Sequence, residues 1–297
     1  MASVQDIKRR VRSVRNTRKI TKAMELVAGA KLRRAQTRIE AMRPYADRML
    51  ELMTGTARAS ASVRGLPLLQ RREVQTALIV PVTADRGLAG GFNAQILRHA
   101  FALERRLRAE GKTVRFAVVG KKGASTLRFR HYELEGAFQG FTDRPTYSDA
   151  QGIAHRLAEL YTGEEVDQVI VVYNHFISPL VQRVTEQEIL PISEQLLARD
   201  EEAEEAERAQ LGDFIYEPEP EEILARLLPV YLETELYRAL LESAASEQGA
   251  RMTAMRNASK NAGELIDRLT LAMNRARQAE ITQEILEVVA GADALTA

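Results

Sequence analysis

A chain of 297 residues, of which 45% are hydrophobic and 28% charged, is long enough for one large domain or two ordinary ones. It contains no cysteine, which excludes disulfides, thiolate zinc sites, iron–sulfur clusters and cysteine nucleophiles, and no apolar run approaches the roughly 18 residues that a membrane span needs. The net charge of +1 hides a basic first segment and an acidic run at 200–207, so we expect one end of the molecule to attract acidic surfaces.

The first segment, from about Val4 to Met53, predicts a long helix because apolar residues recur in it at helical spacing and only Gly29 and Pro44 interrupt it. The apolar stripe steps sideways near Arg18, so the pattern predicts a seam that is not a strict heptad. The stripe consists of Val4, Ile7, Val11, Val14, Ile20, Met24, Val27, Ile39, Met42, Ala46, Met49 and Met53.

The same helix is strongly basic in its first half, where the cations are Lys8, Arg9, Arg10, Arg12, Arg15, Arg18, Lys19 and Lys22. Such a helix could bind nucleic acid, an anionic lipid surface or an acidic protein. Its charges lie all around the helix and no aromatic stacking residue stands among them, which favours the acidic protein partner. A basic-helix nucleic-acid-binding protein is the alternative.

The middle of the chain alternates β-rich apolar runs with helical patterns, which predicts a mostly parallel sheet with covering helices. An alternating run at 181–190 predicts a strand that forms a hairpin with the strand before it. The predicted strands are 76–82, 114–119, 133–137, 166–173 and 181–190, and the predicted helices are 94–110 and 147–161.

The third region opens at Pro218 and Pro220 with a short predicted helix, 221–228, which is expected to end at Pro229. The pattern after it, 230–289, predicts a helix of roughly 90 Å. A compact middle domain could not cover that length, so the helix needs a long partner, and the N-terminal helix is the only candidate in the chain.

The expected fold is therefore α/β plus long α: an antiparallel coiled coil of the N- and C-terminal helices with an inserted Rossmann-like α/β domain. The expected domains are an N-terminal helix at 1–68, a globular domain at 69–215 and a C-terminal helix at 216–297.

A glycine-rich stretch, ADRGLAGGFN, follows the first predicted strand, where dinucleotide-binding loops lie in doubly wound sheets. Its spacing does not match G-x-G-x-x-G, and the chain has no G-x-x-x-x-G-K-[ST]. A tight strand-to-helix turn is therefore favoured over nucleotide binding, and no cofactor is expected. The candidate residues of this turn are Asp85, Arg86, Gly87, Gly90 and Gly91.

Catalytic and metal-binding groups are not recognisable in the sequence. His99, His131, His155 and His175 are scattered, and none is spaced with Asp or Glu as a metal site requires. Ser125 and Ser178 have no nucleophile-elbow context. We expect no catalytic residue and no metal.

The C-terminal end of the last predicted helix is apolar. After Arg277 there is no Lys or Arg, and Ile285, Leu286 and Val289 are among the residues that dominate. An apolar chain end favours aggregation unless a partner encloses it. The pattern indicates a rigid stem with a basic flank and an apolar tip, inserted into a cavity of a larger assembly.

Four segments together resemble the gamma subunit of F-type ATP synthases along nearly the whole chain. They are IKRRVRSVRNTRKITKAMELVAGAKLRRAQ (7–36), DRGLAGGFN (85–93), YEPEPEEILARLLPVYL (216–232) and the run from ALLESAASEQG to AGADAL (239–295). The resemblance implies a non-catalytic central rotor that couples proton-driven rotation of the c-subunit ring to ATP synthesis or hydrolysis. The implied partners are the alpha and beta subunits, the epsilon subunit and the c-ring, without nucleic acid or direct membrane insertion.

The resemblance also implies contacts for individual residues. Lys19, Lys22 and Met24, together with Arg277 and Gln278, would meet beta subunits, and Ile285, Leu286 and Val289 would turn in the collar of the hexamer. We recognise no transit peptide, so the resemblance implies a peripheral protein on the cytoplasmic face of a bacterial cell membrane.

Overall fold

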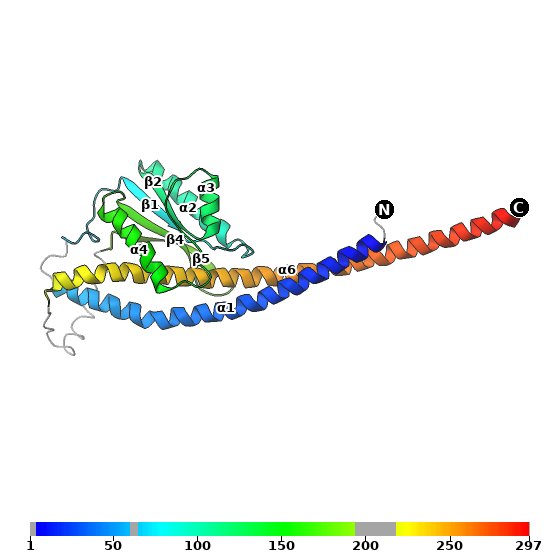
Figure 1. The fold of residues 1–297 in the computed structure, drawn as a ribbon, viewed down its shortest axis with the longest axis horizontal. Coiled ribbons are helices and arrows are strands. Elements are labelled where there is room, and N and C mark those ends of the chain that lie inside the picture. Colours follow the sequence, from blue (N-terminus) through cyan, green and yellow to red (C-terminus); the bar gives the residue numbers. More distant parts are fainter. Residues whose placement is uncertain (1–3, 60–64, 194–217, 297) are drawn as a thin grey trace. The chain divides into compact units, whose positions relative to one another are not determined.

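The computed structural model describes residues 4–59, 65–193 and 218–296, and the side chains of residues 58, 59 and 291–296 are left aside. The acidic run at 200–207 lies outside the described residues. The elements in chain order are α1 (Val4–Ala59), β1 (Thr76–Pro81), α2 (Phe92–Ala109), β2 (Thr113–Val119), α3 (Lys121–Phe129), β3 (Leu134–Phe138), α4 (Tyr147–Thr162), β4 (Gln168–Phe176), β5 (Gln182–Leu190) and α6 (Pro220–Thr296) (Figure 1).

The five strands form one sheet in the order β3-β2-β1-β4-β5. β1 pairs in parallel with β2 and with β4, and β2 pairs in parallel with β3. β5 runs antiparallel to β4, with Phe176 opposite Gln182 at the turn, so the predicted hairpin is confirmed. Helix α3 was not predicted, because its nine residues are too few for a helical period to stand out.

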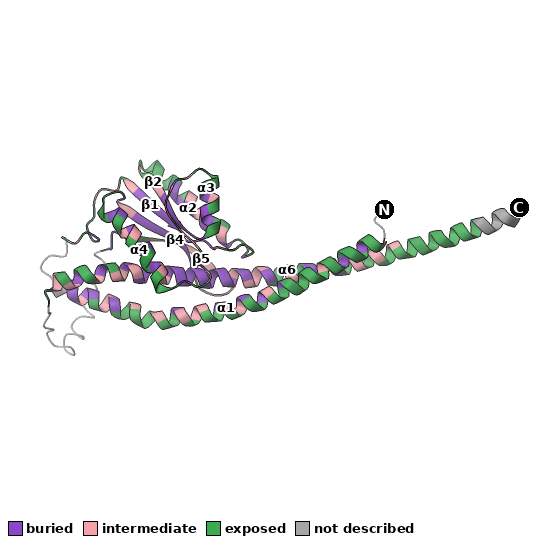
Figure 2. Cartoon of the chain, in the orientation of Figure 1, coloured by how far each residue is buried: buried purple, intermediate pink, exposed green. Residues whose placement is uncertain are grey.

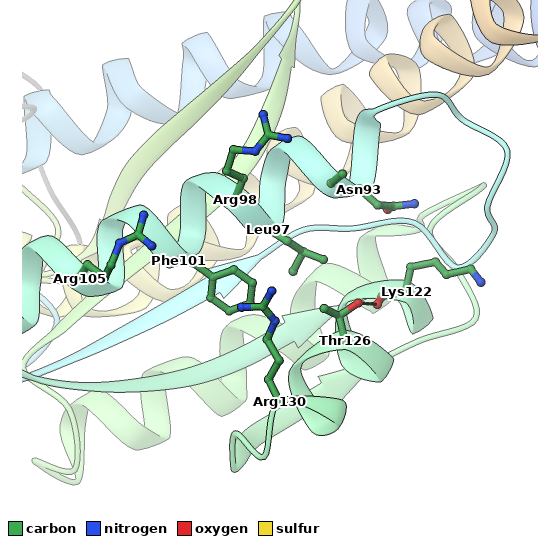
Figure 3. Close-up of a pocket in the computed structure, with 9 residues that line it drawn as sticks. Asn93, Leu97, Arg98, Phe101, Arg105, Lys122, Thr126 and Arg130 are labelled. Atoms are coloured by element: carbon green, nitrogen blue, oxygen red, sulfur yellow. Dashed lines mark hydrogen bonds between the residues drawn. The ribbon is translucent and has the colours of Figure 1, made fainter.

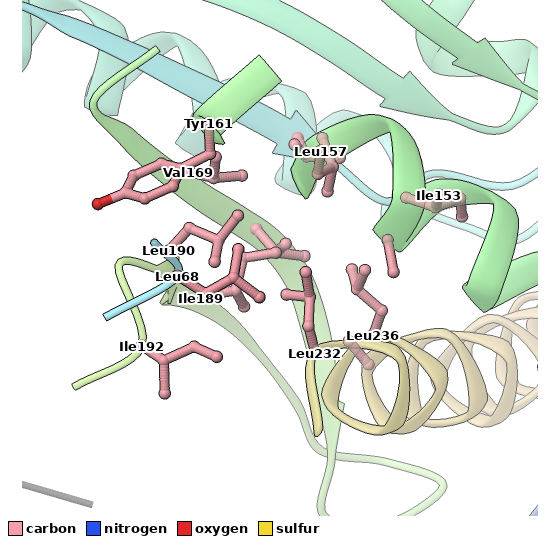
Figure 4. Packing of buried hydrophobic residues seen from close by; sticks show 14 of the residues in the cluster. Leu68, Ile153, Leu157, Tyr161, Val169, Ile189, Leu190, Ile192, Leu232 and Leu236 are labelled. Atoms are coloured by element: carbon pink, nitrogen blue, oxygen red, sulfur yellow. The ribbon is translucent and has the colours of Figure 1, made fainter. Parts of the chain in front are cut away.

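Side chains alternate between the two faces of the sheet, as the pleat of a strand requires. On β1, Leu78 and Val80 enter a core that α4 and α6 close, whereas Ala77 and Ile79 enter a second core that α2 and α3 close. Figure 4 shows the first core, where residues of α4 and α6 meet those of β4 and β5. Both faces are covered, which explains why the parallel strands read as continuous apolar runs.

Two compact units make up the chain. The helical unit consists of Met1–Gly29 and Arg251–Ala297, and the sheet unit is Ala30–Ala250. Helices α1 and α6 each contribute to both units. The division at 1–68, 69–215 and 216–297 follows the sequence pattern instead of the packing, and it stays a prediction.

In the helical unit, α1 and α6 pack antiparallel. Ile7 and Val11 at the start of α1 share one apolar cluster with Ile266, whereas Gly29 lies against Met252, so partner numbers on α6 fall as numbers on α1 rise. The sequence predicted this arrangement, and it gives each helix the long partner that it needs.

The predicted sideways step of the seam near Arg18 is wrong. Ile20 and Val27 are 60% and 56% exposed, and Thr21, Glu25 and Ala28 are buried instead. The buried positions continue the spacing of three and four residues from Val11, so the seam keeps a heptad repeat. The prediction was based on hydrophobicity alone, whereas the seam buries two polar residues, Thr21 and Glu25. Both can be buried because their side-chain oxygens are hydrogen-bonded.

The expected break at Pro229 is also absent, because α6 runs without interruption from Pro220 to Thr296. A proline inside a helix removes one backbone hydrogen bond and crowds the preceding turn. Here Leu224, Leu228, Leu232 and Leu236 bury one face of this stretch in the sheet core, and that packing holds the helix together through the proline.

Candidate functional site: the helix pair and its anchor

The seam of the helical unit contains a buried carboxylate. Arg256 on α6 donates its Nε hydrogen to Glu25 on α1 across 3.1 Å, and Lys22 donates to the other carboxylate oxygen across 3.0 Å. These hydrogen bonds, that of Lys22 first, hold the pKa of Glu25 below its ordinary value. Glu25 therefore stays ionised in the seam, where a paired polar residue favours one register over others.

The candidate contact residues of the helical unit lie in two separate areas. Lys19 and Lys22 are exposed and Met24 is half-buried on α1, whereas Arg277 and Gln278 are exposed on α6. Arg18 lies beside Gly263, so residue 19 stands opposite residue 262 or so, and position 277 is roughly 22 Å further along α6. The structure does not bring the two sets together.

Exposed apolar residues stand among the exposed cations of α1. Ile20, Leu26 and Val27 all have more than half of their surface open to solvent. A face that mixes cations with large apolar groups is typical of a surface that meets another protein.

The far end of α6 has no partner among the described residues. α6 continues past Ala276, which packs against the start of α1, and every described side chain from 277 to 290 is exposed (Figure 2). Ile285, Leu286 and Val289 are 59%, 63% and 51% exposed. The apolar end that the sequence indicated is therefore a helix that the described part of the chain leaves uncovered.

In the sheet unit, Asp85 joins the loops that follow three parallel strands. One carboxylate oxygen accepts from the backbone N–H of Lys121 at 2.9 Å, at the first residue of α3. The other accepts from the N–H of Gly140 at 2.8 Å and from both the N–H and the hydroxyl of Thr142. The carboxylate thus occupies the N-terminus of α3, a position that favours negative charge, and it fills this position with a side chain of the chain itself.

Glycines of this turn and of the loop after β2 also have structural roles. Gly90 has φ +58° and Gly120 has φ +92°, and a Cβ on Gly120 would lie 2.2 Å from the carbonyl oxygen of Thr83. Gly87 and Gly91 shape the loop before α2, and Arg86 is exposed. The Asp85 carboxylate holds the neighbouring loops together. This geometry favours a structural turn over a nucleotide-binding loop.

Helix α6 is anchored in the sheet unit by a stretch buried on all sides. Every residue from 239 to 249 is buried, and many of them are small. Ser246 donates to the carbonyl oxygen of Asn174 on β4 at 3.0 Å, and a Cβ on Gly249 would lie 3.3 Å from the carbonyl oxygen of Pro179. Small side chains let the helix backbone approach the sheet closely.

Two polar contacts complete the anchor, and sequence reasoning missed both. Asp143 accepts from Lys31 on α1 and, at 2.7 Å, from Gln248 on α6. His175 on β4 pairs with Glu242 on α6. The partners are 67 to 112 residues apart in sequence. The run SAASEQG was the only signal, since small residues in a long helix indicate close packing.

Metal and membrane sites are not found in the part of the chain that the structure describes. No three of its His, Asp and Glu side chains cluster as metal ligands would. None of its helices has a stretch long and apolar enough to cross a bilayer.

The chain combines an antiparallel helix pair that has an exposed cationic face with a doubly wound domain, and these features define a helical interaction protein. Comparison with known proteins identifies which one. A family described as ATP synthase matches residues 3–295, and relatives named ATP synthase gamma chain are similar over their full length. The chain belongs to the ATP synthase gamma chain family.

The gamma chain of Moorella thermoacetica is 47% identical over 295 residues, which cover 99% of this chain and all of the relative. That of Rubrobacter xylanophilus is 46% identical over 301 residues, which cover both chains completely. A chain of the central stalk and c-ring structure of Tetrahymena thermophila mitochondrial ATP synthase is 29% identical, with a TM-score of 0.58 over 81% of this chain and 99% of that chain. A chain of the Euglena gracilis mitochondrial enzyme, 18% identical, shares the fold with a TM-score of 0.69 over 98% of this chain and 94% of that chain. None of these supports the nucleic-acid alternative.

Proposed function

We propose that this chain is the central-stalk rotor of a proton-translocating F-type ATP synthase. It transmits rotation of a c-subunit ring to the catalytic sites of an alpha/beta hexamer and contributes no catalytic group itself. Its partners are the alpha, beta and epsilon subunits and the c-ring. The observation that carries the proposal is the full-length similarity to gamma chains, together with the antiparallel helix pair of the helical unit.

Two areas of the helical unit act as contacts to beta subunits in this proposal. The first is Lys19, Lys22 and Met24 on α1, and the second is Arg277 and Gln278 on α6. Their exposure on continuous helices supports the assignment, because a rotor must present its contact groups outward. Ile285, Leu286 and Val289 form the end that turns in the collar of the hexamer.

The chemistry of these contacts suits rotation. A subunit shifts an equilibrium only through its different interaction with the competing states, and an asymmetric shaft presents a different face to each of three equivalent partners. Exposed ion pairs contribute roughly 0–1 kcal/mol each, so exposed cations guide a partner without trapping it. An apolar end adds non-directional contact that tolerates sliding.

The location follows from the assembly. The chain is a peripheral part of the synthase, and on the bacterial relationship it lies at the cytoplasmic face of the cell membrane. Support comes from full-length bacterial gamma chains as relatives.

The test is coupled turnover in a complex reconstituted with alpha and beta subunits. Replacing Arg277 and Gln278 together by Ala is expected to lower ATP synthesis severalfold without loss of assembly, because both side chains are exposed and fold stability does not depend on them. Arg275→Ala is the matched control, since Arg275 is exposed in the same turn and is not an assigned contact. Equal synthesis rates for the double variant and the control would contradict the assignment of Arg277 and Gln278 as contacts to a beta subunit.

A further inference from the structure

A groove of about 550 Å³ lies between α2 and α3, on the side of the sheet away from α4 and α6 (Figure 3). We call it the basic groove. Its lining residues are Asn93, Ala94, Leu97, Arg98, Phe101, Arg105, Lys122, Thr126 and Arg130. The function proposed above leaves this surface unused.

The cations of the basic groove have no carboxylate within ion-pair distance in the described ranges 4–59, 65–193 and 218–296. Neighbouring cations on the same helix are satisfied: Arg106 pairs with Glu186 at 2.5 Å and Arg108 pairs with Glu104 at 2.9 Å. Arg98 and Arg105, two turns apart on α2, remain unpaired within the described chain. Positive charge is thus concentrated on this groove instead of being spread over the helix.

Aromatic contacts shape the floor of the basic groove. Figure 3 shows the guanidinium of Arg130, at the end of α3, beside the ring of Phe101 on α2. The guanidinium carbon is 4.4 Å from the ring centroid. Tyr132 stacks on Phe101 at 5.9 Å. Phe101 is therefore engaged by a cation and by another ring, which argues against stacking of a nucleotide base on it.

The spread of the charges identifies the kind of occupant. Arg98 and Arg105 are roughly 10 Å apart along α2, and Lys122 and Arg130 are roughly 12 Å apart along α3, at 1.5 Å per residue. A single phosphate is too small to meet both ends. A peptide segment with several carboxylates along its length matches this spacing, and its apolar side chains can pack on Leu97 and Phe101.

We infer that the basic groove is a docking site for an acidic, amphipathic segment of another protein subunit of the same complex. The inference rests on the proposed function, because it takes the chain to work inside a multi-subunit synthase. Charge complementarity provides the attraction, and the apolar floor provides the contact that holds the segment in place.

The absence of cysteine makes the groove directly testable. Ala94→Cys places one thiol on the groove in an otherwise cysteine-free chain. The full-length variant is labelled with a photoactivatable crosslinker before assembly with its partner subunits, and crosslinked peptides of the purified complex are identified by mass spectrometry. The expected product is a partner peptide that carries several Asp or Glu residues.

Charge reversal supplies the specificity test. Arg98→Glu with Arg105→Glu is expected to lower the crosslinking yield about tenfold, the size expected from losing two exposed ion pairs and gaining repulsion. Arg128→Glu with Arg144→Glu changes the net charge equally at exposed cations outside the groove and should leave the yield unchanged.

Three results would overturn the inference. The first is a crosslink only to the chain's own run at 200–207, and the second is a crosslink to a neutral segment whose yield does not change on charge reversal. The third is protection of the thiol by inorganic tripolyphosphate, with no crosslinked partner peptide. Assembly is scored separately by stoichiometric co-purification. Failure to assemble counts against the rotor function, whereas assembly without an acidic crosslink counts against the groove alone.

Discussion

Glu25 on α1 and Arg256 on α6 form an ion pair across the seam of the helical unit, with 3.1 Å between the carboxylate oxygen and Nε. Glu25 stands at a heptad position where a coiled coil normally has an apolar residue. Its side chain is 9% exposed, whereas that of Arg256 is 58% exposed, so the charge is buried at one end only. The pair specifies the register of the two helices, and it does so with one partner largely exposed.

Glu25→Gln is expected to lower the free energy of unfolding by roughly 1 kcal/mol at neutral pH, because both cationic partners are largely exposed and solvent weakens the interaction. Chemical denaturation of the full chain measures this change. Glu264→Gln, at an exposed position of α6 without an ion pair among the described residues, is the control and should change little.

The same pair predicts a pH dependence. The pKa of Glu25 is lowered in the folded chain from 4.5, so its contribution is complete above that value and is lost as the pH falls through the lower, folded pKa. The stability difference between the wild type and Glu25→Gln should therefore stay constant from pH 8 to about 5.5 and shrink in more acidic buffer. A difference that grows on acidification would contradict this account.

Asp85→Ala is expected to destabilise the sheet unit by about 3 kcal/mol or more, because four donors lose a charged acceptor and hydrogen bonds to charged groups contribute roughly 1.5–3 kcal/mol each without being additive. Hydrogen exchange should show faster exchange at Gly140 and Thr142, whose N–H groups point to this carboxylate. Arg86→Ala, at the exposed neighbouring residue, should leave exchange at both positions unchanged.

Replacing two glycines by alanine should change the free energy of unfolding in opposite directions. Gly120→Ala places a Cβ 2.2 Å from the carbonyl oxygen of Thr83 at φ +92° and should cost about 3 kcal/mol or prevent folding. Gly152→Ala, inside α4 with open space around it, should stabilise by about 0.5–1 kcal/mol because alanine loses less backbone entropy in a helix. Thermal unfolding of the two variants under one condition decides both claims.

The strands of the sheet could be predicted because apolar β-rich runs leave a strong local signal. β1 was expected at 76–82 and spans Thr76–Pro81, and the hairpin followed from the alternation at 181–190. The antiparallel helix pair followed from length alone, since no other segment could cover the last helix.

The polar part of the seam and the anchor could not be predicted. Thr21 and Glu25 are buried although hydrophobicity points to Ile20 and Val27, and the partner of Glu25 on the other helix, Arg256, cannot be read from the local pattern of α1. Lys31 and Asp143 are 112 residues apart, so their contact depends on the finished fold. The local sequence pattern is enough to predict the helices and strands. The polar contacts between these elements can be identified only from the tertiary structure.

Asp143 provides a test of that tertiary contact. Asp143→Ala should lower the free energy of unfolding by about 1–2 kcal/mol, because Lys31 and Gln248 both lose their acceptor. A double-mutant cycle with Lys31→Ala should give a coupling energy of roughly 0.5–1 kcal/mol, since both side chains are about one-third exposed. A coupling energy near zero would show that Lys31 does not anchor α1.

The exposed end of α6 gives a prediction that separates folding from assembly. Replacing Ile285, Leu286 and Val289 together by Ser should change the free energy of unfolding of the isolated chain by no more than surface substitutions do, about 0.5 kcal/mol each, because all three side chains are already more than half exposed. The variant should aggregate less as a free chain, which light scattering measures, because an uncovered apolar patch drives self-association.

In the reconstituted complex the same variant should bind the hexamer less tightly, since burial of these side chains would stabilise the complex by roughly 25 cal/mol for each Å² of apolar surface. Weaker aggregation with unchanged affinity would mean that this end lies outside the hexamer, and the collar assignment would then be wrong.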